Sequence, residues 1–391
     1  MRTAFFGAAL AGTILALSLS AATAADKIKI GYVSTLSGPA SLIGVHQTEG
    51  FFLAVEELGG VIGGLPADIS KNDDQAKPDV ARQVAEKLVK RDQVDVVTGV
   101  VYSNVMLGLY SAVVDSKTIM LSSNAGPSQI AGKDCSPYFF STSWQNDEPH
   151  AAVGALMQQR GIKRVVLIAS NYQAGQDAMA GFKSKFKGTI VDEIYPAFNQ
   201  PDYSAEITKI ASEKPDAVYA FVAAAGTLPF AKQYAEAGLM KQIPLYSGFM
   251  FNPSTFPAVG DVALGARSAA FWTVDLDNPA SQHFVAAYRK KYQHDPTVYA
   301  AQAYDSVRLL DAAVREIKGK VEDRDAFIKA LATVRYDSVR GPYRYNNNHM
   351  PIENFYATEV VKDQDGHLYE ANRGLILKDE QDAYHQNCPM K

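Results

Sequence analysis

The stretch VDVVTGVVYSNVM, residues Val94–Met106, decides the fold class. Its first half is rich in valine, as is typical of a strand buried in a parallel sheet, and a helix is expected to begin near Asn104. Tyr102, Ser103 and Asn104 therefore place three hydrogen-bonding side chains where a strand ends and a helix starts. Open parallel sheets bind ligands at that edge. These side chains can cap the helix, or they can contact a ligand.

The same alternation of strand and helix continues on both sides of this stretch. In the first part, the strand-like segments KIKIGYV, LPADISKND, VDVVTGV and TIMLSSN alternate with predicted helices at 47–58, 79–90 and 104–115. After Ser141–Trp144, the segments RVVLIAS, TIVDEIYP, DAVYAFVA and IPLYSG alternate with predicted helices at 177–186, 204–212 and 228–237. This spacing predicts two α/β lobes, each a doubly wound parallel sheet with helices on both faces.

The last third of the chain does not form a third lobe. It contains predicted helices at 279–292, 298–317 and 324–332, followed by GPYRY and the strand-like FYATEVV. The chain is thus expected to return to the first lobe and cross again. We predict a signal peptide at 1–25, lobe one at 26–142 plus 276–342, and lobe two with the C-terminal tail at 143–275 plus 343–391. Repeated crossings form a hinge that can close over a ligand.

Composition and the chain ends restrict the class of protein. Charged residues make up 20% of the 391 residues and the net charge is −4, which argues against a nucleic-acid surface or a membrane-binding basic patch. Arg2, an apolar run and Ala22-Thr23-Ala24 form a cleavable export signal, so we expect a periplasmic protein without membrane insertion. In that oxidising compartment Cys135 and Cys388 should form one disulfide, with two unpaired thiols as the alternative.

Catalytic motifs are missing from the sequence. It contains no GxSxG elbow, and no GxGxxG follows the first strand. The segment GPSQIAGKD, Gly126–Asp134, has five residues between its glycines where a phosphate-binding loop has four. The seven histidines never occur at the HExxH or i, i+4 spacing of a metal site on one helix, so they are interpreted as surface or packing residues. We expect no enzyme, no cofactor and no metal.

Polar or aromatic residues instead follow six of the predicted strands. The six loops are Ser37–Gly44, Tyr102–Asn104, Ser122–Gly126, Asn171–Gln173, Ala223–Gly226 and Ser247–Phe251. Each loop has a structural alternative, such as a helix cap, a turn residue or an aromatic packing contact. Because parallel strands end at the same edge, all six loops are predicted to meet at one cleft between the lobes.

Several motifs resemble the branched-chain amino-acid type of periplasmic solute-binding protein. They are IKIGYVSTLSGPA, DDQAKPDVARQVAEKLV, GVVYSN, LSSNAG and PTVYAAQAYDSVRLLDAA, and the resemblance covers nearly the whole mature chain. It implies the type I fold of that family, with two lobes joined by three hinge crossings. It also implies that a small solute is captured by lobe closure and delivered to the permease subunits of an ABC importer. A monomer without a nucleic-acid partner is expected.

The ligand expected from the resemblance differs from an amino acid. Ser103 and Asn124–Gly126 match the positions that hold a ligand carboxylate in the family, helped by helix NH groups. The position of the acid that holds an ammonium falls on Gly248 or Phe249, and the family's tyrosine falls near Ala174, two residues after Tyr172. An ammonium buried without a carboxylate is unfavourable by several kcal/mol.

An aromatic carboxylate is therefore our hypothesis, such as a benzoate, a hydroxybenzoate or a phenylpropenoate, with its ring among Tyr102, Tyr172, Phe249 and Phe251. The predicted ligand-binding residues are Ile43, Tyr102, Ser103, Asn104, Asn124, Ala125, Gly126, Tyr172, Ala225, Gly248, Phe249 and Phe251. One alternative is a branched-chain or other amino acid whose ammonium contacts Tyr172 and backbone carbonyls. Another is a ligand-sensing regulator with the same bilobed fold.

Overall fold

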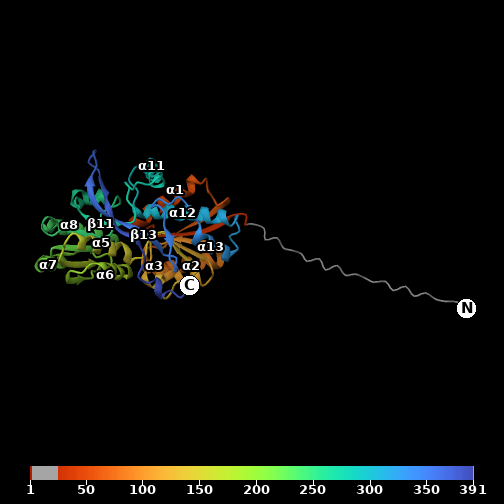
Figure 1. Cartoon of the computed structure of the whole chain (residues 1–391), viewed down its shortest axis with the longest axis horizontal. Coiled ribbons are helices and arrows are strands. Elements are labelled where there is room, and N and C mark those ends of the chain that lie inside the picture. Colours follow the sequence, from red (N-terminus) through yellow and green to blue (C-terminus); the bar gives the residue numbers. More distant parts are fainter. Residues whose placement is uncertain (2–24, 391) are drawn as a thin grey trace.

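The computed structural model describes Met1 and residues 25–390 (Figure 1). The predicted signal peptide, residues 1–25, thus lies almost entirely outside the described residues. Among the described helices, none has the length and apolar character needed to cross a membrane.

The first sheet is built from the N-terminal part of the chain. Its strands are β1 (Ile28–Ser34), β2 (Val61–Ile62), β3 (Leu65–Asp73), β4 (Val96–Gly99), β5 (Ile119–Ser122) and β6 (Phe139–Ser141), in the order β2-β3-β1-β4-β5-β6. All neighbouring strands are parallel except the short β2–β3 pair. The connecting helices are α1 (Leu42–Glu57), α2 (Pro78–Lys87), its π-helical continuation η1 (Leu88–Asp92), α3 (Ser103–Val114) and α4 (Ser128–Ala131).

The second sheet follows the same plan and ends in an antiparallel addition. Its parallel strands are β7 (Arg164–Ala169), β8 (Thr189–Ile194), β9 (Ala217–Phe221), β10 (Leu245–Ser247) and β11 (Arg267–Ala270). Antiparallel strands β12 (Arg344–Tyr345), β13 (Pro351–Lys362) and β14 (Leu368–Glu380) extend it, with β13 pairing with β11. Its longer helices are α5 (Asp147–Gln159), α6 (Gln173–Lys185), α7 (Ser204–Glu213) and α8 (Thr227–Glu236). The shorter segments are η2 (Ala224–Gly226), α9 (Leu239–Gln242), α10 (Phe256–Val259) and η3 (Gly260–Ala263).

Three late helices return to the first sheet, as the sequence predicts. They are α11 (Pro279–Tyr292), α12 (Val298–Glu316) and α13 (Arg324–Thr333), and capping side chains of Asn278, Thr297 and Asp323 fix where they begin. Helix α12 lies along α1 (Figure 1). Gly50 permits this close approach, because a Cβ at that position would lie 2.0 Å from the carbonyl oxygen of Ala300.

The chain passes between the sheets three times, and Arg340 contacts all three passages. Its guanidinium donates to the carbonyl oxygens of Thr142 and Ser143, the latter at 2.8 Å, on the first passage. It lies 4.4 Å from the ring centre of Phe271 on the second and 4.7 Å from that of Tyr343 on the third. Arg340 is therefore a junction that joins the three passages at the hinge.

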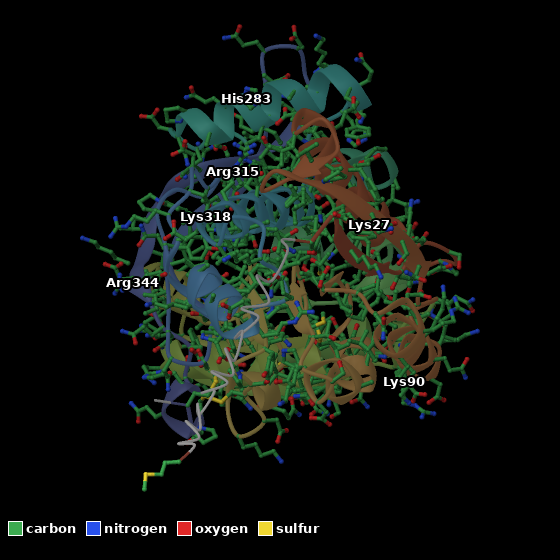
Figure 2. The ribbon with its side chains drawn as sticks, turned by 90° about the vertical axis from the view of Figure 1, so that its right-hand side faces the viewer. Lys27, Lys90, His283, Arg315, Lys318 and Arg344 are labelled. Carbon is green, nitrogen blue, oxygen red and sulfur yellow. A yellow bond between two sulfur atoms is a disulfide. The ribbon has the colours of Figure 1, made fainter. Side chains whose placement is uncertain are left out.

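Buried carboxylates balance the charge of this junction. Arg340 Nη1 lies 2.8 Å from Glu353 Oε2, and its Nε lies 3.4 Å from Asp305 Oδ2. All three side chains are nearly inaccessible to solvent. In contrast, Arg344 pairs with Asp379 at the surface and lies at the edge of the molecule (Figure 2).

The two predicted parallel-sheet lobes are confirmed, and so is the disulfide. The sulfur atoms of Cys135 and Cys388 are bonded across a sequence separation of 253 residues, with 5.7 Å between the Cα atoms. This bond fixes the C-terminal tail to the loop after α4. The exact lobe boundaries remain a prediction.

Candidate functional site

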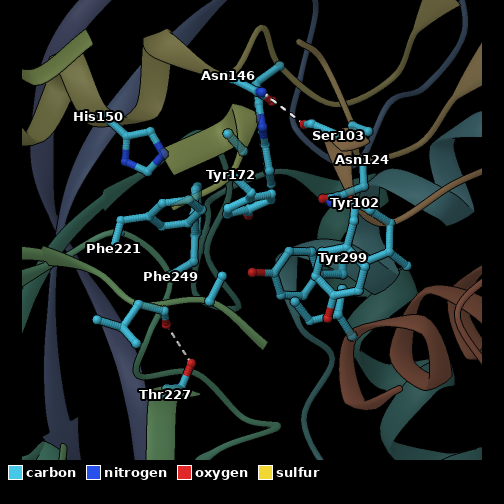
Figure 3. A pocket seen from close by; sticks show the side chains of 18 residues that line it. Tyr102, Ser103, Asn124, Asn146, His150, Tyr172, Phe221, Thr227, Phe249 and Tyr299 are labelled. Carbon is cyan, nitrogen blue, oxygen red and sulfur yellow. Dashed lines mark hydrogen bonds between the residues drawn. The ribbon is translucent and has the colours of Figure 1, made fainter. Parts of the chain in front are cut away.

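A pocket lies between the two lobes, and 18 residues line it (Figure 3). Its empty volume is about 570 Å³, part of which is open to solvent. The lining residues are Ile43, Val101, Tyr102, Ser103, Asn124, Ala125, Trp144, Asn146, His150, Tyr172, Ala174, Phe221, Val222, Ala223, Thr227, Gly248, Phe249 and Tyr299. Most follow the carboxyl ends of parallel strands, which is the edge where such sheets bind ligands.

The N-terminal turn of α3 faces this pocket without a side-chain cap. Tyr102 occupies the N-cap position, and no side chain accepts a hydrogen bond from the first amides of the helix. The preceding Val100 has a φ of +64°, which is unusual for a β-branched residue and turns the chain from β4 into the helix. The capping alternative for Ser103 and Asn104 is therefore not observed.

Ser103 contributes a buried hydroxyl at this helix terminus. Its Oγ accepts a hydrogen bond from Asn146 Nδ2 at 3.0 Å (Figure 3). The same amide nitrogen also donates to Asp177 Oδ2 at 2.8 Å. Because a serine hydroxyl can accept and donate at once, Ser103 retains a proton that it can offer to an acceptor in the pocket.

Two backbone amides assigned to the ligand carboxylate need a correction. The amide of Gly126 donates to Asn146 Oδ1 at 3.1 Å, and the amide of Ala125 donates to the carbonyl of Val100 at 3.3 Å. Both donors are engaged inside the protein, so an anion at this end would depend on Ser103 and the α3 terminus. The sequence could not reveal this, because the acceptor Asn146 lies on the other side of the first interlobe passage.

Tyr102 forms a wall of the pocket. Its hydroxyl donates to the carbonyl oxygen of Ala40 at 2.7 Å, which leaves the ring to face the pocket. The ring of Phe198 contacts it edge-on, with 5.5 Å between centroids. Tyr172 lies beyond Phe198 and is stacked on Phe221 at 6.2 Å.

Aromatic rings from the first passage, from lobe two and from α12 form another wall of the pocket. Phe249 is stacked on Trp144 with 4.7 Å between ring centroids and an interplanar angle of 12°. Tyr299, in the first turn of α12, lies 6.3 Å from Phe249. Phe249 has a φ of +62°, an unfavourable conformation for a bulky residue that is typically maintained at functional sites.

Gly248 leaves room for His150. A Cβ built on Gly248 would lie 2.5 Å from His150 Cε1 and 2.7 Å from its Nδ1. The imidazole is fixed by a 2.6 Å hydrogen bond between Nδ1 and the hydroxyl of Tyr219. No acidic side chain can therefore occupy position 248 while His150 keeps this position.

The pocket carries no formal charge. Among the 18 lining residues there is no Asp, Glu, Lys or Arg. Burial lowers the pKa of His150 to about 3, so its imidazole is neutral at physiological pH. Burial also raises the pKa values of Tyr102 and Tyr172, so both phenols stay protonated. The pocket thus offers no ionic partner for an ammonium group.

The structure brings most of the predicted ligand residues together. Eight of them line the pocket: Ile43, Tyr102, Ser103, Asn124, Ala125, Tyr172, Gly248 and Phe249. Ala225 lines an adjoining cavity of about 480 Å³ that shares Ile43, Tyr102 and Phe249. Asn104 and Gly126 are not among the lining residues of either cavity, and Phe251 is only 1% exposed within the hydrophobic core of lobe two.

The residues that the sequence analysis missed come mainly from the passages and helices next to the strands. Trp144 belongs to the first passage, Asn146 and His150 to α5 and its cap, and Tyr299 to α12. Trp144 could have been noticed, because it is the last residue of the segment Ser141–Trp144 at the predicted first crossing. Asn146 and His150 could not, because the helix that positions them was not predicted.

Comparison with known proteins gives consistent matches. Residues 27–366 match a family model described as periplasmic binding protein. A curated relative from Brucella melitensis is named Leu/Ile/Val-binding protein homolog 6. It is 29% identical, and the match covers 92% of this chain and 95% of the relative's chain.

Two solved structures from R. palustris are similar over almost their full length. One is an ABC-transporter solute-binding protein in complex with benzoate; it is 32% identical, covers 93% of this chain and 100% of its own, and has a TM-score of 0.87. The other is in complex with 3,4-dihydroxybenzoic acid and is 29% identical. The match covers 92% of this chain and 99% of the other protein's chain, with a TM-score of 0.86.

Proposed function

The chain belongs to the periplasmic binding protein family, and on that premise we propose that it captures an aromatic carboxylate for an ABC importer. The single observation that carries the choice of ligand is the uncharged pocket with aromatic walls and Gly248 where an ammonium-binding acid would be needed. Capture takes place in the periplasm after export, and the loaded protein delivers the solute to permease subunits. The role is transport rather than catalysis.

The carboxylate would bind at the α3 terminus. There the Ser103 hydroxyl and the uncapped amides of the first turn meet the positive end of the helix dipole. Hydrogen bonds to a charged acceptor contribute about 1.5–3 kcal/mol each, so this set of neutral donors can hold a carboxylate without a lysine or arginine.

The aromatic ring of the ligand would lie against the ring pair Trp144 and Phe249 and the ring of Tyr299. Offset-stacked or edge-on aromatic pairs add about 0.5–1.5 kcal/mol to the gain from apolar burial. The neighbouring structures with benzoate and 3,4-dihydroxybenzoic acid support a ligand of this size and shape.

A branched-chain amino acid is the second candidate, because a curated relative carries a Leu/Ile/Val-binding name. Its ammonium would have to rely on neutral oxygens such as the Tyr172 hydroxyl. Burying an ammonium without a carboxylate is unfavourable by several kcal/mol, and His150 occupies the space next to Gly248 that an acid would need.

Binding would be coupled to lobe closure. Ser103 comes from lobe one, whereas Phe249 and His150 come from lobe two, so only the closed form gives the ligand all its contacts. The ligand then favours closure by its differential affinity for the two forms. For an uptake system we expect a dissociation constant of about nanomolar to micromolar.

Isothermal titration calorimetry tests the proposal. Protein freed of bound ligand by unfolding and refolding is titrated with benzoate, 4-hydroxybenzoate, 3,4-dihydroxybenzoate and leucine. We expect at least one aromatic acid to bind with a dissociation constant below about 10 μM and leucine to give no heat. Tight leucine binding together with no response to the aromatic acids would overturn the choice of ligand.

A further inference from the structure

Three metal-ligating side chains converge outside the pocket, on the side of lobe one where α1 meets α11. His46 and Glu49 are one turn apart on α1, and His294 lies just after α11. One ligand atom from each residue lies within 4.8 Å of the others. We propose that His46, Glu49 and His294 bind a divalent transition-metal ion, for which Zn²⁺ is the best fit.

The spacing of the donor atoms suits such an ion. Glu49 Oε2 lies 3.6 Å from His46 Nδ1 and also 3.6 Å from His294 Nε2. Ligands at 2.0–2.1 Å from a tetrahedral zinc are about 3.3 Å apart. The two distances to Glu49 Oε2 are therefore close to those of a zinc site, the two imidazoles lie within 4.8 Å of each other, and a water molecule could complete the tetrahedron.

A neighbouring hydrogen bond orients His294 in the way that metal sites require. His294 Nδ1 donates to the carbonyl oxygen of Asp295 at 3.1 Å, which leaves the lone pair of Nε2 directed at Glu49. Histidine ligands commonly donate their second ring NH to a backbone carbonyl in this manner. Tyr288 donates its hydroxyl to Glu49 Oε2, and the same hydroxyl lies 3.2 Å from His46 Nδ1, so a bound metal ion would have to displace it from both donor atoms.

The surroundings of the three donors are partly buried and contain paired charges. His46 is only 7% exposed, so its imidazole lies at the buried end of the cluster. Two cations of α11 are engaged elsewhere, since Lys291 pairs with Glu56 and Arg289 with Asp295. Glu49 thus provides a negative charge that the metal would neutralise.

The donor set also determines the class of metal. Two imidazoles and one carboxylate form a set typical of zinc, and imidazole also suits copper and nickel. Mg²⁺ and Ca²⁺ prefer oxygen ligands and should bind weakly or not at all. The proposal departs from the sequence expectation of no metal, which considered only spacing within one helix, whereas here position 294 joins 46 and 49 from a distant segment.

A metal at this site would fix two elements that carry pocket residues. Ile43 lies one turn before His46 on α1, and Tyr299 follows His294 by five residues in the first turn of α12. The ion would join these segments within lobe one and leave the hinge passages free. Its role would be structural, independent of which solute the pocket takes.

Zinc titration of the chelator-treated full chain tests the proposal. We expect one equivalent of Zn²⁺ to bind with a micromolar or lower dissociation constant and to raise the melting temperature by several degrees. Glu49→Gln and His294→Ala should each weaken binding by at least about 10-fold. Co²⁺ bound to the parent protein should show the visible absorption of a tetrahedral site.

His283→Ala is the matched control. His283 also pairs with a glutamate of α1, Glu57, at 3.1 Å, but only two donors meet there; it lies on the outer face of α11 (Figure 2). This variant should retain the zinc affinity of the parent. The proposal is overturned if the parent binds no zinc, or if Glu49→Gln and His294→Ala bind zinc as tightly as the parent does.

Discussion

Ser103 combines two properties that a helix cap alone does not need. Its Oγ accepts from Asn146, the N-cap residue of α5, and its own proton remains available in the pocket. Tyr102, which occupies the N-cap position, uses its hydroxyl on Ala40 and presents its ring to the same space. At the residue scale, Ser103 thus offers a hydrogen bond to an anion, and Tyr102 provides an aromatic wall.

Replacing Ser103 with alanine should therefore affect binding more than folding. We expect the affinity for the aromatic acid to fall about 10-fold, because one charge-assisted hydrogen bond is lost. The melting temperature of the empty protein should change by less than about 2 °C, because Asn146 keeps its bond to Asp177. Calorimetry and thermal unfolding measure the two effects. Ser111→Ala, on the exposed face of the same helix, is the control and should leave both unchanged.

Gly248 and His150 offer a second test at this scale. Gly248→Ala should lower the free energy of unfolding by about 1–3 kcal/mol, because the new methyl group meets the imidazole at 2.5 Å. In a His150→Ala background the same substitution should cost much less. A double-mutant cycle by denaturant unfolding gives the coupling energy, which we expect to exceed about 1 kcal/mol. Additive effects would show that the two side chains do not compete for space.

At the element scale, the sequence predicts most strands and most of the longer helices because their hydrophobic periods are clear, but it does not predict β2, β6, β11 or β14. Helix α5 was missed because its first turns carry Asp147, Glu148 and His150, which do not read as an apolar face. All three are nevertheless buried, since α5 lies between α6 and the late strands β11, β13 and β14. Tertiary contacts rather than periodicity position this helix, so Asn146 and His150 could not be predicted for the site.

The loops at the strand ends were more predictable than the donors within them. Parallel topology places Ser103 at the carboxyl edge of the first sheet and Tyr172 and Phe249 at that of the second, and the pocket brings the three together. Which amides stay free depends on contacts across the passages. That is why the assignment of the Ala125 and Gly126 amides needed correction.

The passages between the lobes should depend strongly on Arg340. Arg340→Ala leaves Asp305 and Glu353 buried without their cation, which should cost about 3–5 kcal/mol of unfolding free energy. Arg344→Ala is the matched control, because its partner Asp379 is exposed and such pairs contribute at most about 1 kcal/mol. Urea unfolding of both variants provides the comparison. Equal losses would mean that the Arg340 junction does not stabilise the hinge.

At the scale of the whole molecule, buried carboxyl groups gather where α5, the C-terminal tail and the late strands meet. Asp147 is 7% exposed, accepts a 2.9 Å hydrogen bond from the hydroxyl of Tyr384, and has Asp177 and Asp382 nearby. Burial, reinforced by the negative charge of Asp177, raises the pKa of Asp147 to about 7. The folded protein therefore holds a proton on Asp147 that the unfolded chain releases near pH 4.

The pH dependence of stability follows from this difference in proton binding. Between about pH 4 and 7 the folded state binds one more proton at Asp147 than the unfolded state does, so this group makes stability fall as the pH rises. Asp147→Asn mimics the protonated acid and removes the effect. The free energy of unfolding of the variant minus that of the parent should therefore rise by roughly 3 kcal/mol between pH 4 and pH 7.5.

Denaturant unfolding of parent and variant across this pH range measures that gain. Buried histidines such as His46 and His150 titrate in both proteins, so their contributions cancel in the difference. Asp79→Asn, at an exposed position in α2, is the control and should show a difference that hardly changes with pH. If the difference in free energy of unfolding between Asp147→Asn and the parent also stays constant with pH, the carboxyl of Asp147 is already ionised in the folded protein at pH 4. The contact between α5 and the C-terminal tail would then have to accommodate a buried negative charge.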